Sequence, residues 1–211
     1  MIEISNVSKR YGKTIVLRNI SAKLESGTIY GLVGPNGCGK TTLMRCICGF
    51  AKPDEGFVRV DGKVIGKDCD FAPSMGIIIE TPGFLSHMTA RQNLSILSDI
   101  SGKAPKERID EVIRQVGLDP NDRKPVGKYS LGMRQRLGIA QSLLENPTAL
   151  LWDEPFNGLD ADGIADIHRL LHERKMLGNT ILLVSHSEAD IAKACDCVFH
   201  MENGEVKCLD E

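Results

Sequence analysis

The sequence predicts an α/β domain with an antiparallel β subdomain, a core built on a parallel sheet, and an inserted helical subdomain. Three observations lead to this prediction. Short β-like runs fill the first third of the chain, as the alternating stretch 2–7 shows. Continuous apolar runs at 149–152 and 181–184 are each followed by a helical pattern, which is typical of buried parallel strands. Three helical patterns follow one another between residues 89 and 144.

The N-terminal third supplies most of the expected strands. A hairpin is indicated where the strand 57–60 is followed by Asp61 and Gly62. The run 75–79 is apolar throughout, as a fully buried strand would be. The expected strands cover residues 2–7, 15–17, 20–24, 29–33, 57–60, 75–79, 149–152, 181–184, 197–201 and 205–208.

The helices have recognisable starts and ends. Thr89, with Gln92 three positions later, is typical of a helix N-terminus, and Gly117 of a helix end. The expected helices cover residues 43–47, 89–100, 106–116, 131–144, 163–177 and 187–195. The 211 residues suit one domain. We assign about 1–84 and 147–211 to the core with its β subdomain, and about 85–146 to the helical subdomain.

A glycine-rich loop joins the strand 29–33 to the helix 43–47. Its residues are Gly34, Pro35, Asn36, Gly37, Cys38, Gly39, Lys40, Thr41 and Thr42. This is the Gly-x-x-x-x-Gly-Lys-Ser/Thr pattern of a phosphate-binding loop. Lys40 can reach the β- and γ-phosphates of a nucleotide, and the Thr41 hydroxyl can bind Mg²⁺. A turn that merely ends in Lys-Thr is less favoured, because strand and helix flank the motif. The pattern predicts a P-loop NTPase core of the RecA-like type.

Two carboxylates, Asp153 and Glu154, end the apolar run 149–152. Beside a phosphate loop we expect Asp153 to hold Mg²⁺ through water, and Glu154 to act as general base on the attacking water. His186 follows the run 181–184, at the sheet edge where open α/β sheets bind ligands. We expect it to hydrogen-bond the γ-phosphate, the alternative being an ordinary exposed histidine. The histidines that we interpret as structural or solvated are His87, His168, His172 and His200.

Two further segments resemble motifs of the ATP-binding cassette (ABC) ATPases. Residues 129–137 read Tyr-Ser-Leu-Gly-Met-Arg-Gln-Arg-Leu and resemble the family's signature motif. Residues 153–160 read Asp-Glu-Pro-Phe-Asn-Gly-Leu-Asp and resemble its second carboxylate motif, which runs into the D-loop. His186 matches the family's switch histidine, and Tyr11 matches the aromatic residue that stacks on adenine. The resemblance covers essentially the whole chain and implies the ABC ATPase fold.

This resemblance implies a head-to-tail pair of nucleotide-binding domains. Each ATP is then held between the phosphate loop of one copy and the signature of the other. Ser130 and Gly132 would face the partner's γ-phosphate at the N-terminus of a helix, where the dipole favours anions. The pair is either a homodimer or a heterodimer with a second ABC ATPase. The signature and D-loop residues concerned are Ser130, Leu131, Gly132, Met133 and Asp160.

The sequence departs from the family pattern at three positions. Leu131 replaces the first glycine of the signature and Met133 its glutamine. Glu80 stands where the family usually has a glutamine after the third core strand. We count Glu80 with Thr41 and Asp153 as candidate Mg²⁺ ligands, since a carboxylate can support the ion or its water.

Glu80 and the segments 89–94 and 129–136 together resemble one branch of the family. This branch contains the ATPases of bacitracin-type and lantibiotic self-immunity exporters of Gram-positive bacteria. The resemblance implies integral-membrane permease subunits as partners and a location on the inner face of the cell membrane. The alternative is a soluble ABC ATPase that remodels a non-membrane partner. A P-loop kinase would leave the Ser130 motif, Asp160 and His186 unexplained.

Composition limits which partners, location and metal sites we expect for this chain. The formal net charge is −2, from 26 basic and 28 acidic residues, so we expect no nucleic-acid binding. No apolar stretch approaches the roughly 20 residues that cross a bilayer, and the N-terminus lacks a secretory signal, so we expect a cytoplasmic chain. The seven cysteines show no Cys-x₂₋₄-Cys spacing, which favours small buried hydrophobes over zinc ligands. Whether Cys38 has a redox role stays open.

Overall fold

A computed structural model describes residues 1–80, 83–185 and 188–208. One group of strands is β1 (Ile2–Tyr11), β2 (Thr14–Leu24), β4 (Glu55–Val60) and β5 (Lys63–Val64). The other is β3 (Thr28–Val33), β6 (Met75–Ile78), β7 (Ala149–Asp153), β8 (Thr180–Val184), β9 (Cys197–Glu202) and β10 (Glu205–Cys208). The helices are α1 (Lys40–Cys48), α2 (Ala90–Ser101), α3 (Lys106–Gln115), α4 (Leu131–Leu143), α5 (Ala161–Met176) and α6 (Glu188–Ala194), with a short 3-10 turn η1 (Val126–Lys128).

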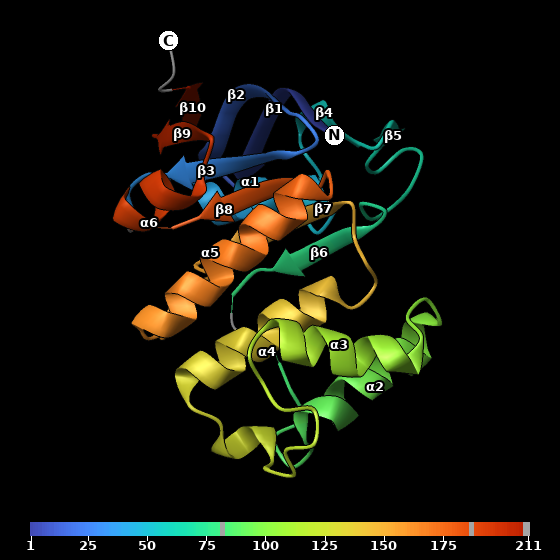
Figure 1. Cartoon of the computed structure of the whole chain (residues 1–211). Coiled ribbons are helices and arrows are strands. Elements are labelled where there is room, and N and C mark those ends of the chain that lie inside the picture. Colours follow the sequence, from blue (N-terminus) through green and yellow to red (C-terminus); the bar gives the residue numbers. More distant parts are fainter. Residues whose placement is uncertain (81–82, 186–187, 209–211) are drawn as a thin grey trace.

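The strands form two sheets that lie one above the other (Figure 1). The antiparallel sheet has the order β2–β1–β4–β5, and the larger, mainly parallel sheet has the order β10–β9–β3–β8–β7–β6. Helix α1 lies between the sheets, α5 and α6 cover the opposite face of the larger sheet, and α2, α3 and α4 gather at one end below β6 (Figure 1). The predicted α/β architecture, with a separate β layer and a helical insertion, is confirmed.

Two apolar cores hold these layers together. Between the sheets, Ile4, Met44 and Leu151 belong to one buried cluster. On the other face of the large sheet, Trp152 shares a cluster with Leu137 of α4. The side chains of neighbouring residues on β7 therefore pack in opposite cores, as the two-residue period of a buried strand requires. The helix that follows the signature residues is thus anchored in the same core as the strand that ends in Asp153.

Strand register brings the expected site residues to one edge. In the parallel pairs, Leu32 lies opposite Val184, Val184 opposite Asp153, and Trp152 opposite Ile78. The carboxyl ends of β3, β8, β7 and β6 therefore coincide. Ligands of open α/β sheets bind at such an edge.

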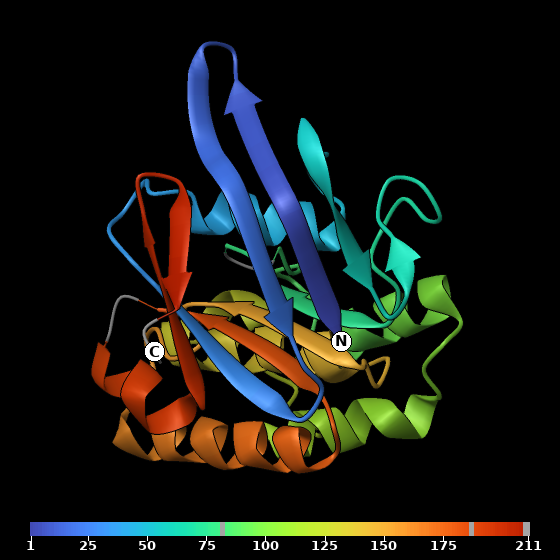
Figure 2. The same ribbon diagram turned by 90° about the horizontal axis from the view of Figure 1, so that it is seen from above.

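The N-terminal hairpin differs from the sequence prediction. The runs 15–17 and 20–24 form a single strand, β2, and β1 continues as far as Tyr11. Register shifts interrupt the ladder, and Asn19 adopts a φ of 46° while its N–H donates to Ser8 Oγ at 3.1 Å. A bulge of this kind tolerates polar residues without ending the strand, which is why the broken apolar pattern was misleading. Figure 2 shows the resulting long hairpin of β1 and β2.

The other predicted strands and helices are confirmed, with small differences at their ends. The predicted start of α2 is a complete capping box. Thr89 Oγ1 accepts from Gln92 N at 3.3 Å, and Gln92 Oε1 accepts from Thr89 N at 2.9 Å. On α3, Ile109, Val112 and Ile113 are buried, as their spacing predicted.

Candidate nucleotide site

The glycine-rich loop connects β3 to the N-terminus of α1. The helix begins at Lys40 and has Gly39 at its N-cap, with a φ of 115°. A Cβ at Gly39 would lie 2.9 Å from the carbonyl oxygen of Val16, so a glycine is required both by the backbone conformation and by the contact with β2. The first N–H groups of α1 have no partner within the helix, and its dipole favours an anion at this end.

Lys40 turns back over this loop. Its ammonium donates to the carbonyl oxygens of Gly34 at 2.7 Å and Pro35 at 3.0 Å. Asn36 and Gly37 are exposed, whereas Cys38 is buried. The Lys40 ammonium can exchange these two carbonyls for phosphate oxygens, because an anionic oxygen attracts a cation more strongly than a neutral carbonyl does.

Thr41 and Asp153 meet across the gap between α1 and β7. The Thr41 hydroxyl donates to Asp153 Oδ2 at 3.3 Å. Burial raises the pKa of the Asp153 carboxyl, and the neighbouring Glu154 raises it further. A hydroxyl and a carboxylate are the hard oxygen donors that Mg²⁺ prefers, and a cation here would relieve the excess negative charge. The residues therefore fit the expected ion.

Glu154 lies just past the end of β7, in a left-handed conformation with a φ of 49°. Its N–H donates to the carbonyl oxygen of Val184 at 2.8 Å, and Ser185 Oγ donates to its Oε2 at 3.3 Å. From the helical part, Gln135 Nε2 donates to its carbonyl oxygen at 3.2 Å. The candidate base is thus fixed by β8 on one side and by α4 on the other.

Glu80 follows β6 at the same edge and also has a positive φ, of 64°. Its carboxylate forms an ion pair with the guanidinium of Arg45 on α1. The structure brings Glu80 near Asp153, whose pKa it helps to raise. Sequence reasoning missed Arg45, although it stands one helical turn after Thr41 and so shares its face of α1. It also gave no role to Gln135, which lies inside the quoted signature segment.

The signature residues form the N-terminus of α4. Ser130 is the N-cap, and its Oγ accepts from Met133 N at 3.2 Å. Leu131 is 51% exposed and covers Gly158, where a Cβ would lie 2.6 Å from Leu131 Cγ. A Cβ at Gly132 would lie 2.5 Å from the carbonyl oxygen of Gly158. The signature and the D-loop therefore touch with no room for a further carbon atom.

A cavity of about 520 Å³ opens beside this contact. Residues that line it include Ser130, Gly132, Arg136, Gly158 and Asp160. Asp160 is the N-cap of α5, and its Oδ1 accepts from Gly163 N at 2.9 Å. The structure thus places Ser130, Gly132, Met133 and Asp160 around this cavity, and Leu131 contacts Gly158 at its border.

Tyr11 lies at the end of β1, where it pairs with Thr14 in the hairpin. Its ring is 51% exposed, and Lys9 Nζ lies 5.4 Å from the ring centroid. A second cavity, of about 330 Å³, lies between this hairpin and the phosphate loop, lined in part by Thr14, Val16, Asn36 and Cys38. Tyr11 does not itself line this cavity, and its exposure leaves it available for stacking.

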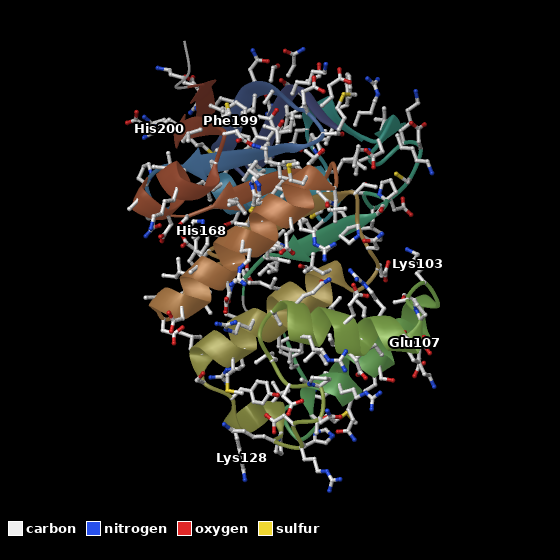
Figure 3. All side chains as sticks on the ribbon, viewed as in Figure 1. Lys103, Glu107, Lys128, His168, Phe199 and His200 are labelled. Atoms are coloured by element: carbon white, nitrogen blue, oxygen red, sulfur yellow. The ribbon has the colours of Figure 1, made fainter. Side chains whose placement is uncertain are left out.

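His186 lies outside the described residues. Of the other histidines, His168 stacks on Phe156 with ring centroids 4.9 Å apart, and burial lowers its pKa. Figure 3 shows His168 on α5 and His200 on β9, while Lys103, Glu107 and Lys128 lie on the periphery of the helical part. The packing of His168 supports its structural interpretation.

Comparison with known proteins identifies the family. The profile described as "ABC transporter" matches residues 17–157. The chain belongs to this family. It is 44% identical to the ABC transporter ATP-binding protein YybJ of Bacillus subtilis, over 100% of this chain and 97% of that protein.

Two further relatives carry transport functions in their names. The bacitracin transport ATP-binding protein BcrA of Enterococcus faecalis is 41% identical over 97% of this chain and 67% of the length of BcrA. The lantibiotic transport ATP-binding protein SrtF of Streptococcus pyogenes is 34% identical over 98% of this chain and 89% of the length of SrtF.

Solved structures agree with this assignment. An ATP-binding subunit of an ABC transporter superimposes with a TM-score of 0.88 at 27% identity, over 100% of this chain and 90% of that one. A nucleotide-free ATP-binding cassette from an ABC transporter superimposes with a TM-score of 0.84 at 26% identity, over 98% of this chain and 89% of that one. The ABC ATPase is therefore an ATP-binding and ATP-hydrolysing subunit of a transporter, and the soluble alternative is not favoured. Within 1–80, 83–185 and 188–208, no helix has the length and apolarity needed to cross a membrane.

Proposed function

We propose that this ABC ATPase drives export of a peptide antibiotic through separate integral-membrane permease subunits, from the cytoplasmic face of the membrane. The observation that carries the proposal is the similarity to BcrA and SrtF over nearly the whole chain. Glu80, two residues past β6, supports the same branch together with the segments 89–94 and 129–136, because the sequence there departs from the usual glutamine.

Binding of ATP is proposed to begin at the phosphate loop. The N–H groups of the loop and of the first turn of α1 bind the β- and γ-phosphates. Lys40 exchanges its bonds to the Gly34 and Pro35 carbonyls for phosphate oxygens. Tyr11 stacks on the adenine at the far side of the loop.

Hydrolysis is proposed to use the carboxylates at the strand ends. Thr41 and Asp153, with Glu80 as a further candidate, would hold Mg²⁺, which would neutralise charge on the transferring phosphoryl group. Glu154 accepts a proton from water while the water oxygen bonds to the γ-phosphorus and the bond to the leaving oxygen of ADP breaks. Ser185, which donates to Glu154 Oε2, orients the carboxylate.

A second nucleotide-binding domain is proposed to complete the site. The N-cap of α4 gives Ser130 and Gly132 a position from which N–H groups and a hydroxyl can meet a γ-phosphate. Each donor aimed at the transferring phosphoryl group lowers the barrier by about 3 kcal/mol. The partner is a second copy of this chain or a sister ATPase.

The test is reconstitution with the permease genes that neighbour this one. Co-expression in a host sensitive to bacitracin and lantibiotics is expected to raise the inhibitory concentration of one of these peptides. A detergent-stable complex with the permeases should copurify. The Glu154→Gln variant should form the complex and give no resistance. Failure to copurify, together with unchanged sensitivity to both peptide classes, would contradict the proposed function.

A further inference from the structure

The nucleotide edge of the sheet carries an excess of negative charge. Asp153 ends β7, Glu154 directly follows it, and Glu80 follows the neighbouring strand β6. Burial and Glu154 raise the pKa of the Asp153 carboxyl, and Glu80 contributes in the same direction. Strand register supports this proximity, because Ile78, two residues before Glu80, pairs with Trp152, which directly precedes Asp153. A nucleoside triphosphate, which is itself strongly anionic, must bind next to these three carboxylates.

Helix α1 supplies a cation opposite the extra carboxylate. Thr41 and Arg45 are four residues apart, so they lie on the same face of the helix, one turn from each other. The Thr41 hydroxyl contacts Asp153, and the Arg45 guanidinium pairs with Glu80. The helix that begins at the phosphate loop thus contacts both acidic strand ends.

The position of Arg45 determines where Glu80 is held. Arg45 is five residues beyond Lys40, which at 1.5 Å per residue is roughly 7.5 Å along the helix axis. The pairing therefore holds the Glu80 carboxylate against the guanidinium of Arg45, on the face of α1 that also carries Thr41. The left-handed backbone of Glu80, with a φ of 64°, is part of the same turn.

This ion pair contributes little to folding. The side chains of Arg45 and Glu80 are 42% and 65% exposed. Pairs as exposed as this one contribute about 0–1 kcal/mol to stability. A weak pair is also easily exchanged, so its significance lies in its place beside the nucleotide site.

We propose that Arg45 is a positioning residue for Glu80, holding its carboxylate against α1 and offsetting its negative charge beside the bound triphosphate. Arg45 thereby offsets the charge that this chain acquires by having glutamate in place of glutamine. Without Arg45, the Glu80 carboxylate repels ATP. With a glutamine at position 80, Arg45 has no charge to offset and becomes dispensable for binding. The inference rests on the proposed function of this edge as the nucleotide site.

The experiment is a double-mutant cycle read out by ATP binding in EDTA. Calorimetric titration of ATP without Mg²⁺ measures affinity independently of hydrolysis. Arg45→Ala is expected to weaken affinity about fivefold in the native background and less than about twofold in the Glu80→Gln background. Arg45→Lys, which keeps the charge, should restore most of the affinity. Arg59→Ala removes a comparable ion pair, with Glu3 on the antiparallel sheet and 35% exposed, and should leave affinity unchanged.

The outcomes separate this inference from the proposed function. If Arg45→Ala weakens ATP binding equally in both backgrounds, Arg45 acts on the nucleotide or the fold and not through Glu80. If it weakens binding in neither background, the positioning role is also wrong. In both cases the nucleotide site itself stands, because the native protein still binds ATP. Absence of ATP binding by the native protein would overturn the site and the inference together.

Discussion

Gln135 Nε2 donates a hydrogen bond to the carbonyl oxygen of Glu154 at 3.2 Å. The donor belongs to α4, whose N-cap is Ser130, and the acceptor directly follows β7. Glu154 has a φ of 49°, so its backbone depends on surrounding contacts to stay in this conformation. The bond therefore joins the helix that carries the signature to the backbone of the candidate base.

Gln135→Ala should lower the turnover of ATP without weakening its binding. Loss of one hydrogen bond of about 1 kcal/mol corresponds to about a fivefold fall in kcat, provided that the bond holds Glu154 in its reactive orientation. Steady-state hydrolysis measures kcat, and equilibrium titration measures ATP affinity. Gln141→Ala, on the same helix but away from Glu154, is the matched control and should leave both unchanged. An unaltered kcat in Gln135→Ala would contradict the coupling.

Lys40→Ala should weaken ATP binding by more than about tenfold, because a charge-assisted contact to the phosphates is lost. In the structure the Lys40 ammonium satisfies the carbonyl oxygens of Gly34 and Pro35, so the loop is also expected to loosen without it. Titration of ATP measures the affinity, and a melting curve tests the fold. Native affinity in a folded Lys40→Ala protein would contradict the role of this lysine.

Glu154→Gln should stop hydrolysis and preserve ATP binding. An amide cannot accept the proton, so a fall in kcat of about 10²-fold or more is expected. The amide oxygen can still accept from Ser185 Oγ, which contacts Oε2 at 3.3 Å, so the local fold should survive. Light scattering after gel filtration with Mg²⁺ and ATP should show a dimer. Hydrolysis at the native rate would rule out Glu154 as the base.

The placement of the phosphate loop, Asp153 and Glu154 at strand ends could be predicted from the sequence because each follows directly from a local pattern. A strand, a glycine-rich loop and a helix are contiguous, and an apolar run that ends in two acids needs no tertiary information. The capping box at Thr89 was predictable for the same reason.

The contacts between distant elements could not be predicted in this way. The pairing of Arg45 with Glu80 depends on the angle at which α1 crosses β6, and sequence spacing does not give this angle. The bond from Gln135 to the Glu154 carbonyl depends on where the helical part docks. The continuity of β2 through Asn19 depends on its partner β1, because a bulge is a property of the pair.

Gly132→Ala should disturb the contact between the signature and the D-loop. A Cβ there would lie 2.5 Å from the carbonyl oxygen of Gly158, so backbone must shift at a cost of about 1–3 kcal/mol. The expected results are a lower melting temperature and a weaker dimer in the Glu154→Gln background. Gly83→Ala is the matched control, because a Cβ at Gly83 would meet no atom within 4 Å. Equal melting temperatures for the two alanine variants would show that the contact is not tight.

Ser142→Ala should destabilise the core behind the nucleotide edge. Trp152, the single tryptophan of the chain, is fully buried, and its Nε1 donates to Ser142 Oγ at 3.0 Å. Removing the acceptor leaves a buried N–H unsatisfied, which costs about 1–3 kcal/mol. Urea unfolding followed by the fluorescence of Trp152 measures this loss directly.

Trp152→Phe, which removes the donor, is the control for the destabilisation caused by Ser142→Ala. With the donor already absent, adding Ser142→Ala should destabilise the protein less than it does in the native background, as measured by circular dichroism. Trp152, which makes this bond, directly precedes Asp153 on β7. A titration of ATP therefore reports whether the loss of the bond also disturbs the nucleotide site. Because neighbouring residues of a strand face opposite cores, we expect the stability to fall and the ATP affinity of the folded fraction to stay within about twofold. An equal loss of stability in both backgrounds would mean that Ser142 stabilises the core through its bond to the Ile139 carbonyl instead.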